Sequence, residues 1–264
     1  MKKVLVAFVM ILLLLSLCAC SVPANSFMSR AQASSLAKKY PNPQAVLTLT
    51  YKTDGKTIEM KITYDLLLAQ APIAVTRFIQ LANEGAYDGT VVDTYDSTYK
   101  YVVMGRYGKD EEDNRWYDYR SADITFAGEF EQNGYRAPRD GYAQFETYSL
   151  AMYHENSGSQ FDSANGTFLL ALKSDTLNSS NYAVFAHFAS MTILTDGEVT
   201  TQETTSKRPQ LNDKMTSLTG RTTRTVYDVD GSNSRSVQIV SSEVTLTVEI
   251  SETPDGWKKL PTIR

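Results

Sequence analysis

Cysteine is scarce in this chain of 264 residues, and its scarcity excludes a disulfide framework. The two cysteines, Cys18 and Cys20, both belong to an N-terminal apolar stretch, so no pair remains in the rest of the sequence. Histidine is equally scarce. The two histidines, His154 and His187, stand outside any metal-ligand spacing. We therefore expect no metal, no cofactor and no disulfide, and a fold that depends on a packed apolar core.

Signatures of several other protein classes are also missing. There is no GxSxG nucleophile elbow, and the HEN sequence at residue 154 lacks the second histidine of a zinc-protease helix. The formal net charge is −4 and no basic stripe occurs, which argues against a nucleic-acid partner. DVDGSN at residues 228–233 resembles a calcium loop but lacks the later glutamate, so a hairpin turn is the better interpretation.

The N-terminus is apolar but too short for a comfortable membrane span. Two lysines precede the apolar run at residues 4–17, a pattern typical of an export signal. LCAC at residues 17–20 resembles a bacterial lipobox, which implies that residues 1–19 are removed and that Cys20 carries lipid. The alternatives are an ordinary secretory signal or an uncleaved anchor. The expected location is outside the cytoplasm, anchored to a bacterial membrane through Cys20.

The clearest local signals lie between residues 45 and 89. Apolar residues alternate on either side of Asp54-Gly55, which predicts a β-hairpin. Residues 71–89 then carry a proline suited to the first helical turn and, at Gly85, a stop signal. The buried stripe of this helix is expected to be Val75, Phe78, Ile79 and Ala82, at the i, i+3, i+4, i+7 spacing.

Further strands are predicted downstream of this helix. Residues 90–105 are expected to form two strands around a turn, and residues 223–240 a second hairpin. The strict alternation of EVTLTVEI at residues 243–250 predicts a closing strand. Residues 197–236 are rich in Thr, Ser, Asp and Lys.

Three blocks, in order, resemble the cyclophilin-type peptidyl-prolyl isomerases. They are the hairpin and helix ending in GAYDGT, then ITFAGEFEQNG at residues 124–134, then YSLAMYHENSGSQFDSANGTFLLAL with NYAVFAHF. The resemblance implies a mainly β fold, a cyclophilin-like closed antiparallel β-barrel with capping helices, over residues 45–252. The resemblance also implies that residues 197–236 are an insertion, because a compact cyclophilin has only a short helix and loop at that place. Residues 20–44 would be a tether and residues 253–264 a C-terminal tail.

The resemblance also implies a substrate-binding set, and several members depart from the family pattern. Aligning DSANGTFLL with the family DSATSQFFI puts Thr167 at a glutamine, Phe168 at a core phenylalanine and Leu169 at the floor of the proline pocket. The remaining substrate-binding positions are Tyr101 and Val102 at a groove-lining Phe and Met, Met104 at a second glutamine, and Leu177 at a leucine. The apolar pocket is thus partly kept, and the polar groups around it are mostly replaced.

The catalytic arginine of the family has no counterpart in this sequence. Alignment forward from Gly89 puts Thr94 at that position, whereas alignment backward from Gly105 puts Asp96 there. Tyr182, at a family histidine, and Thr94 are therefore the candidate catalytic residues. A further alternative is that Arg106, Arg115 or Arg120 reaches over the groove, although their charged stretch is more typical of a solvated loop.

The resemblance implies an isomerase that acts on proline-containing segments of exported proteins, with weakened catalysis. The alternative is a non-catalytic peptide-binding or scaffolding lipoprotein on the same fold. In both hypotheses the chain is a monomer whose membrane contact is its lipid anchor.

Overall fold

The computed structural model describes residues 35, 43–120, 125, 128–130, 143–154, 164–174, 177–203 and 221–252. The predicted signal, Cys20, most of the tether and the tail at residues 253–264 lie outside these residues, so their assignments stay predictions. Within the described part of the chain, no helix combines the length and the apolar character needed to cross a membrane.

Strands dominate the described chain. They are β1 (Gln44–Thr53), β2 (Lys56–Leu66), β3 (Thr90–Asp96), β4 (Tyr101–Lys109), β5 (Trp116–Asp118), β6 (Leu150–Met152), β7 (Phe168–Ala171), β8 (Val184–Thr195), β9 (Glu198–Glu203), β10 (Thr222–Asp228), β11 (Ser234–Ile239) and β12 (Ser241–Glu252). The described helices are α3 (Pro72–Asn83) and the short 3-10 helix η3 (Ser179–Asn181).

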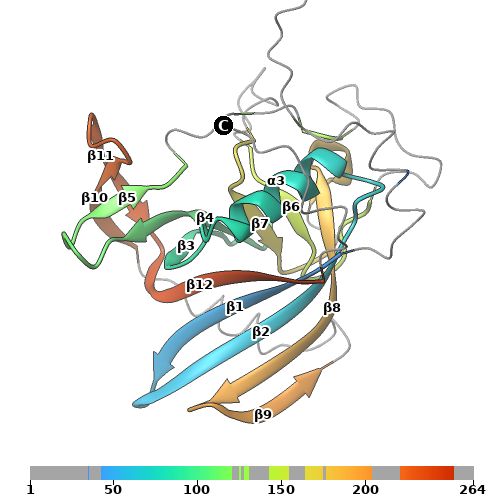
Figure 1. The fold of residues 1–264 in the computed structure, drawn as a ribbon, viewed down its shortest axis with the longest axis horizontal. Coiled ribbons are helices and arrows are strands. Elements are labelled where there is room, and N and C mark those ends of the chain that lie inside the picture. Colours follow the sequence, from blue (N-terminus) through green and yellow to red (C-terminus); the bar gives the residue numbers. More distant parts are fainter. Residues whose placement is uncertain are drawn as a thin grey trace, which may run out of the picture.

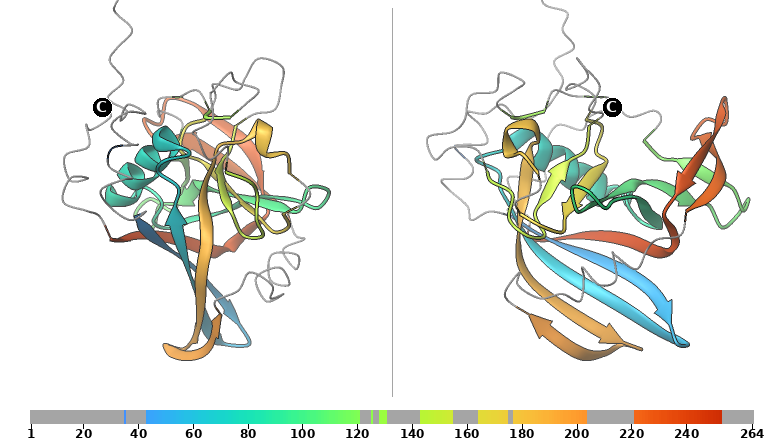
Figure 2. Two further views of the ribbon diagram at one scale, coloured as in Figure 1. Left: turned by 90° about the vertical axis from the view of Figure 1, so that its right-hand side faces the viewer. Right: turned by 180° about the vertical axis from the view of Figure 1, so that it is seen from behind.

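Several of these strands form a ring within one sheet (Figures 1 and 2). Around the ring the order is β3, β4, β7, β6, β8, β2, β1, β12 and back to β3, and every neighbouring pair is antiparallel. This arrangement confirms the predicted antiparallel, cyclophilin-like architecture. Where capping helices were expected, the described residues contain one α-helix, α3, which lies against β8 and β12.

The first hairpin and α3 form as their sequences predict. Asp54 and Gly55 both have positive φ, 50° and 76°, as a two-residue hairpin turn requires. α3 begins at Pro72, and Gly85 just beyond its end has a φ of 68°. The Glu129 carboxylate accepts hydrogen bonds from the N–H groups of Ile73 and Ala74, at 3.0 and 2.8 Å, and so satisfies donors that the first helical turn leaves free.

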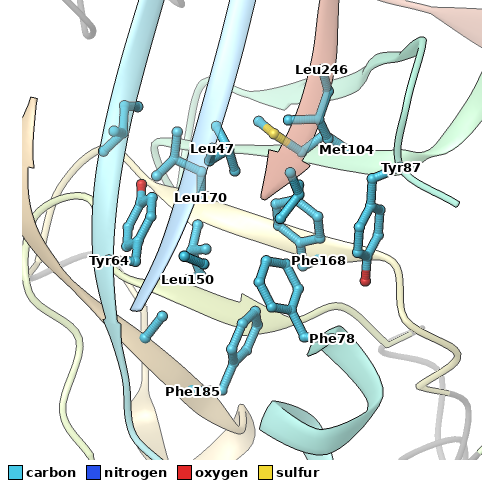
Figure 3. Close-up of a cluster of buried hydrophobic side chains, with 14 of the residues drawn as sticks. Leu47, Tyr64, Phe78, Tyr87, Met104, Leu150, Phe168, Leu170, Phe185 and Leu246 are labelled. Atoms are coloured by element: carbon cyan, nitrogen blue, oxygen red, sulfur yellow. The ribbon is translucent and has the colours of Figure 1, made fainter. Parts of the chain in front are cut away.

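The interior of the ring is filled by an inner cluster to which α3 contributes its predicted face. Val75, Phe78 and Ile79 are buried. The Phe78 ring lies 5.5 Å from the Phe168 ring and 4.9 Å from the Phe185 ring, between centroids (Figure 3). We use the name inner cluster for these residues and the buried side chains around them, which include Leu47, Tyr64, Tyr87, Val102, Met104, Leu150, Leu170 and Leu246.

A second hairpin lies outside the ring. β10 and β11 pair antiparallel, as predicted, and β10 pairs in parallel with β5, which in turn pairs with β4 (Figure 1). The predicted closing strand is also present as β12, and it pairs with β1 and β3. The segment interpreted as containing an insertion includes β9, β10 and part of β11 in its described portion.

Candidate functional site

The strands β3, β4, β7, β6 and β8 carry apolar side chains on both faces, and the face opposite the inner cluster is the candidate site. Five residues face one another in register across this sheet: Thr94, Val103, Leu169, Ala151 and Val184. Around them lies a second buried group, which we call the outer cluster: Leu67, Tyr101, Val103, Phe145, Ala151, Leu169, Ala171, Tyr182 and Val184, with Ala143, Tyr153 and Leu177 packed against it.

The structure brings several predicted site residues together on this face. Tyr101, Leu169 and Tyr182 belong to the outer cluster, and Leu177 packs against it while partly exposed. Thr94 is exposed on β3 directly opposite Val103, at the edge of the same face. An apolar floor bordered by hydroxyl groups is suited to an apolar ring attached to a polar backbone.

Three residues predicted to contact substrate point the other way. Val102, Met104 and Phe168 have no exposed surface and belong to the inner cluster. Because successive side chains of a strand face opposite sides, the neighbours of Tyr101, Val103 and Leu169 must face the interior. The substrate-contact assignment is therefore corrected for these residues: they support the candidate site from inside the ring.

Thr167 lies at the border between the two clusters. It is 1% exposed, and its hydroxyl has no hydrogen-bond partner among the described residues. Its carbonyl accepts from the Tyr153 N–H at 2.9 Å, which places it beside a residue that packs on the outer cluster. The structure keeps Thr167 next to the candidate site with its hydroxyl buried.

Tyr182 is held by a stack of rings that the sequence did not reveal. The imidazole of His154 lies between Phe130 and Tyr182, with centroid distances of 5.2 and 4.8 Å. Its Nε2 donates to the carbonyl of Asn181 at 2.6 Å, since a carbonyl can only accept. His154 therefore has a structural role in this stack. Its neighbourhood could not be predicted, because the hydrogen bond joins residues 27 positions apart in the sequence.

Tyr101 keeps its phenolic proton in the outer cluster. Burial raises the pKa of Tyr101 well above its usual value, and the nearby Tyr182 and Asp96 raise it further. A neutral phenol is a hydrogen-bond donor, so Tyr101 can donate to a ligand carbonyl at ordinary pH.

The three arginines considered as replacements for the family arginine interact elsewhere. Arg106 forms an ion pair with Asp118, with 3.1 Å between Nη2 and Oδ2. Arg120 donates to the carbonyl of Ala86 at 2.8 Å. The Arg115 guanidinium lies over a tyrosine ring on β10, at 5.2 Å from the ring centroid. These contacts do not support the hypothesis that one of them reaches over the groove.

A buried carboxyl group lies on β3 next to Thr94. Asp93 is 3% exposed and stands where the pairing of β3 with β4 is irregular. Burial raises the pKa of Asp93 well above its usual range, and the neighbouring Arg106 lowers it only in part. The charged groups near Asp93, which are Arg106 and Asp118, therefore interact with one another. Arg106 lies on β4 and Asp118 on the adjoining strand β5.

An antiparallel ring of strands around an apolar interior places this chain in the class of barrel-like β proteins. The sequence profile of the family described as cyclophilin type peptidyl-prolyl cis-trans isomerase/CLD matches residues 48–219. This chain therefore belongs to the cyclophilin-type peptidyl-prolyl cis-trans isomerase family.

Two solved structures resemble this chain. The crystal structure of a cyclophilin type peptidyl-prolyl cis-trans isomerase from Cryptosporidium parvum matches with 10% identity and a TM-score of 0.43, covering 81% of this chain and 99% of that one. The structure of the same protein in the presence of the dipeptide Ala-Pro matches with 11% identity and a TM-score of 0.39, covering 78% and 99%. No curated protein matches this chain.

Proposed function

We propose that this protein binds proline-containing segments of exported proteins on the outer cluster and isomerises their prolyl bonds slowly. The observation that carries the proposal is the composition of that face. It combines a buried apolar floor at Leu169 and Val103 with hydroxyl groups at Tyr101, Tyr182 and Thr94, on a chain of the isomerase family.

The expected low rate of isomerisation follows from the type of hydrogen-bond donor on this face. Rotation about a peptide bond has a barrier of about 18–20 kcal/mol, because the C–N bond must lose its partial double-bond character. An apolar floor binds the planar and the twisted amide about equally and so contributes affinity more than rate. Selective stabilisation of the twisted amide needs a well-placed donor, and loss of one such donor typically costs about 3–4 kcal/mol in the transition state.

The donors on the described part of this face are neutral. Thr94 stands at the edge of the face, and Tyr101 and Tyr182 lie within the outer cluster. A neutral hydroxyl gives roughly half the hydrogen-bond strength of a charged group. We therefore assign donation to Tyr182 with help from Tyr101, and expect a rate far below that of a cyclophilin that retains its arginine.

A proline-isomerisation assay on the purified protein tests this function directly. We expect slow catalysis of an Ala-Pro peptide and a higher rate in Thr94→Arg, because a guanidinium would then border the floor. Thr223→Arg is the matched control, since Thr223 is exposed on β10 and adds the same charge away from the outer cluster. A rate at the level of an arginine-containing cyclophilin, lost on changing Arg106, Arg115 or Arg120, would overturn the assignment of Tyr182.

A non-catalytic binding role is the second candidate, and one observation favours it. Arg106, Arg115 and Arg120 make their contacts outside the outer cluster. Calorimetric titration with a proline-containing peptide separates the two functions. Binding without measurable isomerisation, even in Thr94→Arg, would establish the scaffolding role, whereas absence of binding would contradict both.

The place of action is proposed to be the outer side of a bacterial membrane. The lipobox-like residues 17–20 support this proposal, with Cys20 as the lipidated N-terminus. Mass spectrometry of the native protein should find lipid on Cys20, and Cys20→Ala should release the protein from membranes. An unmodified chain that begins at another residue would contradict it.

A further inference from the structure

A cavity lies at the opposite end of β4 from Tyr101, where the β10–β11 hairpin meets the ring. Its volume is about 640 Å³. Small-molecule sites usually have volumes of about 300–1,000 Å³. The lining residues are Gly89, Val91, Lys109, Glu111, Asn114, Trp116, Arg224 and Thr245. None of them belongs to the outer cluster, so this cavity is separate from the proposed proline site.

The cavity depends on strands that follow the segment matched by the family. Arg224 comes from β10 and Thr245 from β12, whereas the family profile ends at residue 219. β10 reaches the cavity through its parallel pairing with β5, in which Val226 faces Trp116 (Figure 1). This placement makes the cavity a feature of the hairpin that this chain adds beside β5.

Arg224 is the charged group that most directly suggests a ligand. Its guanidinium lies over the Trp116 ring, with Cζ 5.6 Å from the ring centroid. Its Nε is buried and has no hydrogen-bond partner among the described residues. The neighbouring Arg235 differs, because its guanidinium pairs with the carboxylates of Asp118 and Asp228. No hydrogen bond or ion pair joins the Arg224 guanidinium to another described residue, so its outer donors are available to an anion bound in the cavity.

A second cation and an apolar wall complete the cavity. Lys109 is exposed at the end of β4 and makes no ion pair with a described residue. Val91 is buried and the Trp116 ring is half-buried, so together they offer an apolar surface beside the two cations. The single carboxylate of the lining, Glu111, leaves the cavity with a net positive charge.

We propose that this cavity binds a small carboxylate or phosphate that carries a planar apolar group. The two Nη groups of the Arg224 guanidinium match the two oxygens of such an anion and can donate to them in parallel. Lys109 adds a point charge near the entrance, and the planar group lies against Trp116 and Val91. This inference does not depend on the proposed isomerase function.

Trp116 can report binding in the full chain. The sequence has two tryptophans, so Trp257→Phe leaves Trp116 as the single emitter. The probes are benzoate, phenyl phosphate and the neutral benzamide. We expect a saturable change of Trp116 fluorescence with at least one anion and none with benzamide. A response to benzoate alone identifies a carboxylate site, and a response to phenyl phosphate alone identifies a phosphate site.

Further substitutions in the Trp257→Phe protein test whether the fluorescence change comes from binding in the cavity. Arg224→Gln should raise the apparent Kd by about tenfold or more, since a charged hydrogen bond is lost, and Arg224→Lys should raise it less. Lys109→Gln, at an exposed position, should weaken binding without affecting the fold. Arg221→Gln is the matched control, because Arg221 is exposed and does not line the cavity.

Three results would overturn the proposal. They are an absence of response to both anions, an equal response to benzamide, and an unchanged Kd in both Arg224→Gln and Lys109→Gln. Circular dichroism of each variant shows whether it is folded, and loss of fold in Arg224→Gln leaves Lys109→Gln as the deciding measurement.

Discussion

The two faces of β4, β7 and β6 are both apolar, yet their surroundings differ. On the inner face, aromatic rings pack edge to face, as in the pair Phe78 and Phe168, whose planes meet at 85°. On the outer face, Leu169 and Val103 are bordered by hydroxyl groups and by partly exposed side chains such as Leu177. A shift of one residue along a strand therefore separates the groups that hold the ring together from those of the outer cluster, where we propose that a peptide binds.

The contrast is clearest at Leu169 and Leu170, which are neighbours on β7. Both are fully buried, but Leu170 belongs to the inner cluster and Leu169 to the outer one. Two leucines with the same exposed fraction therefore belong to different clusters. Exposure alone does not identify the site, whereas the face on which a residue lies does.

The largest effect is expected when the inner face loses an aromatic ring. Phe78→Ala should lower the free energy of unfolding by about 3–5 kcal/mol, because a large buried side chain leaves a cavity that the ring of strands cannot refill. Urea denaturation measures this change in the free energy of unfolding. Tyr99→Ala is the control, since Tyr99 is 53% exposed and its change should be small. A cost near zero for Phe78→Ala would mean that α3 does not pack as described.

The paired variants Leu170→Ala and Leu169→Ala test the two faces against each other. Each should cost about 2–5 kcal/mol of stability, as buried leucines do. Under conditions where both variants remain folded, only Leu169→Ala should weaken binding of a proline-containing peptide, measured by calorimetry. Equal losses of binding in the two variants would remove the distinction between the faces.

A pH-dependent effect is expected at Asp93, beside the outer face. Because burial raises its folded-state pKa, the folded chain retains a proton that the unfolded chain has lost. The stability from Asp93 is thus fully present below its unfolded pKa, about 3.9, and is lost as pH rises through the higher folded value. Asp93→Asn should therefore gain stability relative to the unmodified protein as pH rises from about 4 toward neutrality.

Unfolding by urea at pH 4 and at pH 7 measures that difference. Asp54→Asn is the matched control, because Asp54 is an exposed carboxylate in the β1–β2 turn. A difference between Asp93→Asn and the unmodified protein that does not change with pH would contradict the assignment of a buried, proton-binding carboxyl.

The smallest effect is expected for a single hydroxyl of the outer face. Tyr182→Phe keeps the ring that stacks on His154 and removes one neutral donor. Loss of such a hydrogen bond is worth about 0.5–1.5 kcal/mol, so the isomerisation rate should fall about 2- to 10-fold with little change in stability. A full rate in Tyr182→Phe, with a reduced rate in Tyr101→Phe, would transfer the donor role to Tyr101.

Local sequence signals determined much of the fold. Alternation around Asp54-Gly55 and the spacing of Val75, Phe78 and Ile79 were sufficient to predict the first hairpin and the buried face of α3. These features depend on neighbours within a few residues, for which periodicity carries the information. The family resemblance then placed Tyr101, Leu169, Leu177 and Tyr182, which the structure brings together.

Tertiary structure alone decided which residues face the site and which partners the charged groups choose. Residues 101–104 of β4 are apolar throughout, so their pattern contains no alternation from which to distinguish the interior from the outer face, and Val102 and Met104 were assigned to the wrong one. One partner of Asp118 is likewise distant, since Arg235 lies 117 residues away on another hairpin. Contacts between remote segments depend on how the strands close into a ring, and a linear pattern of residues does not record that closure.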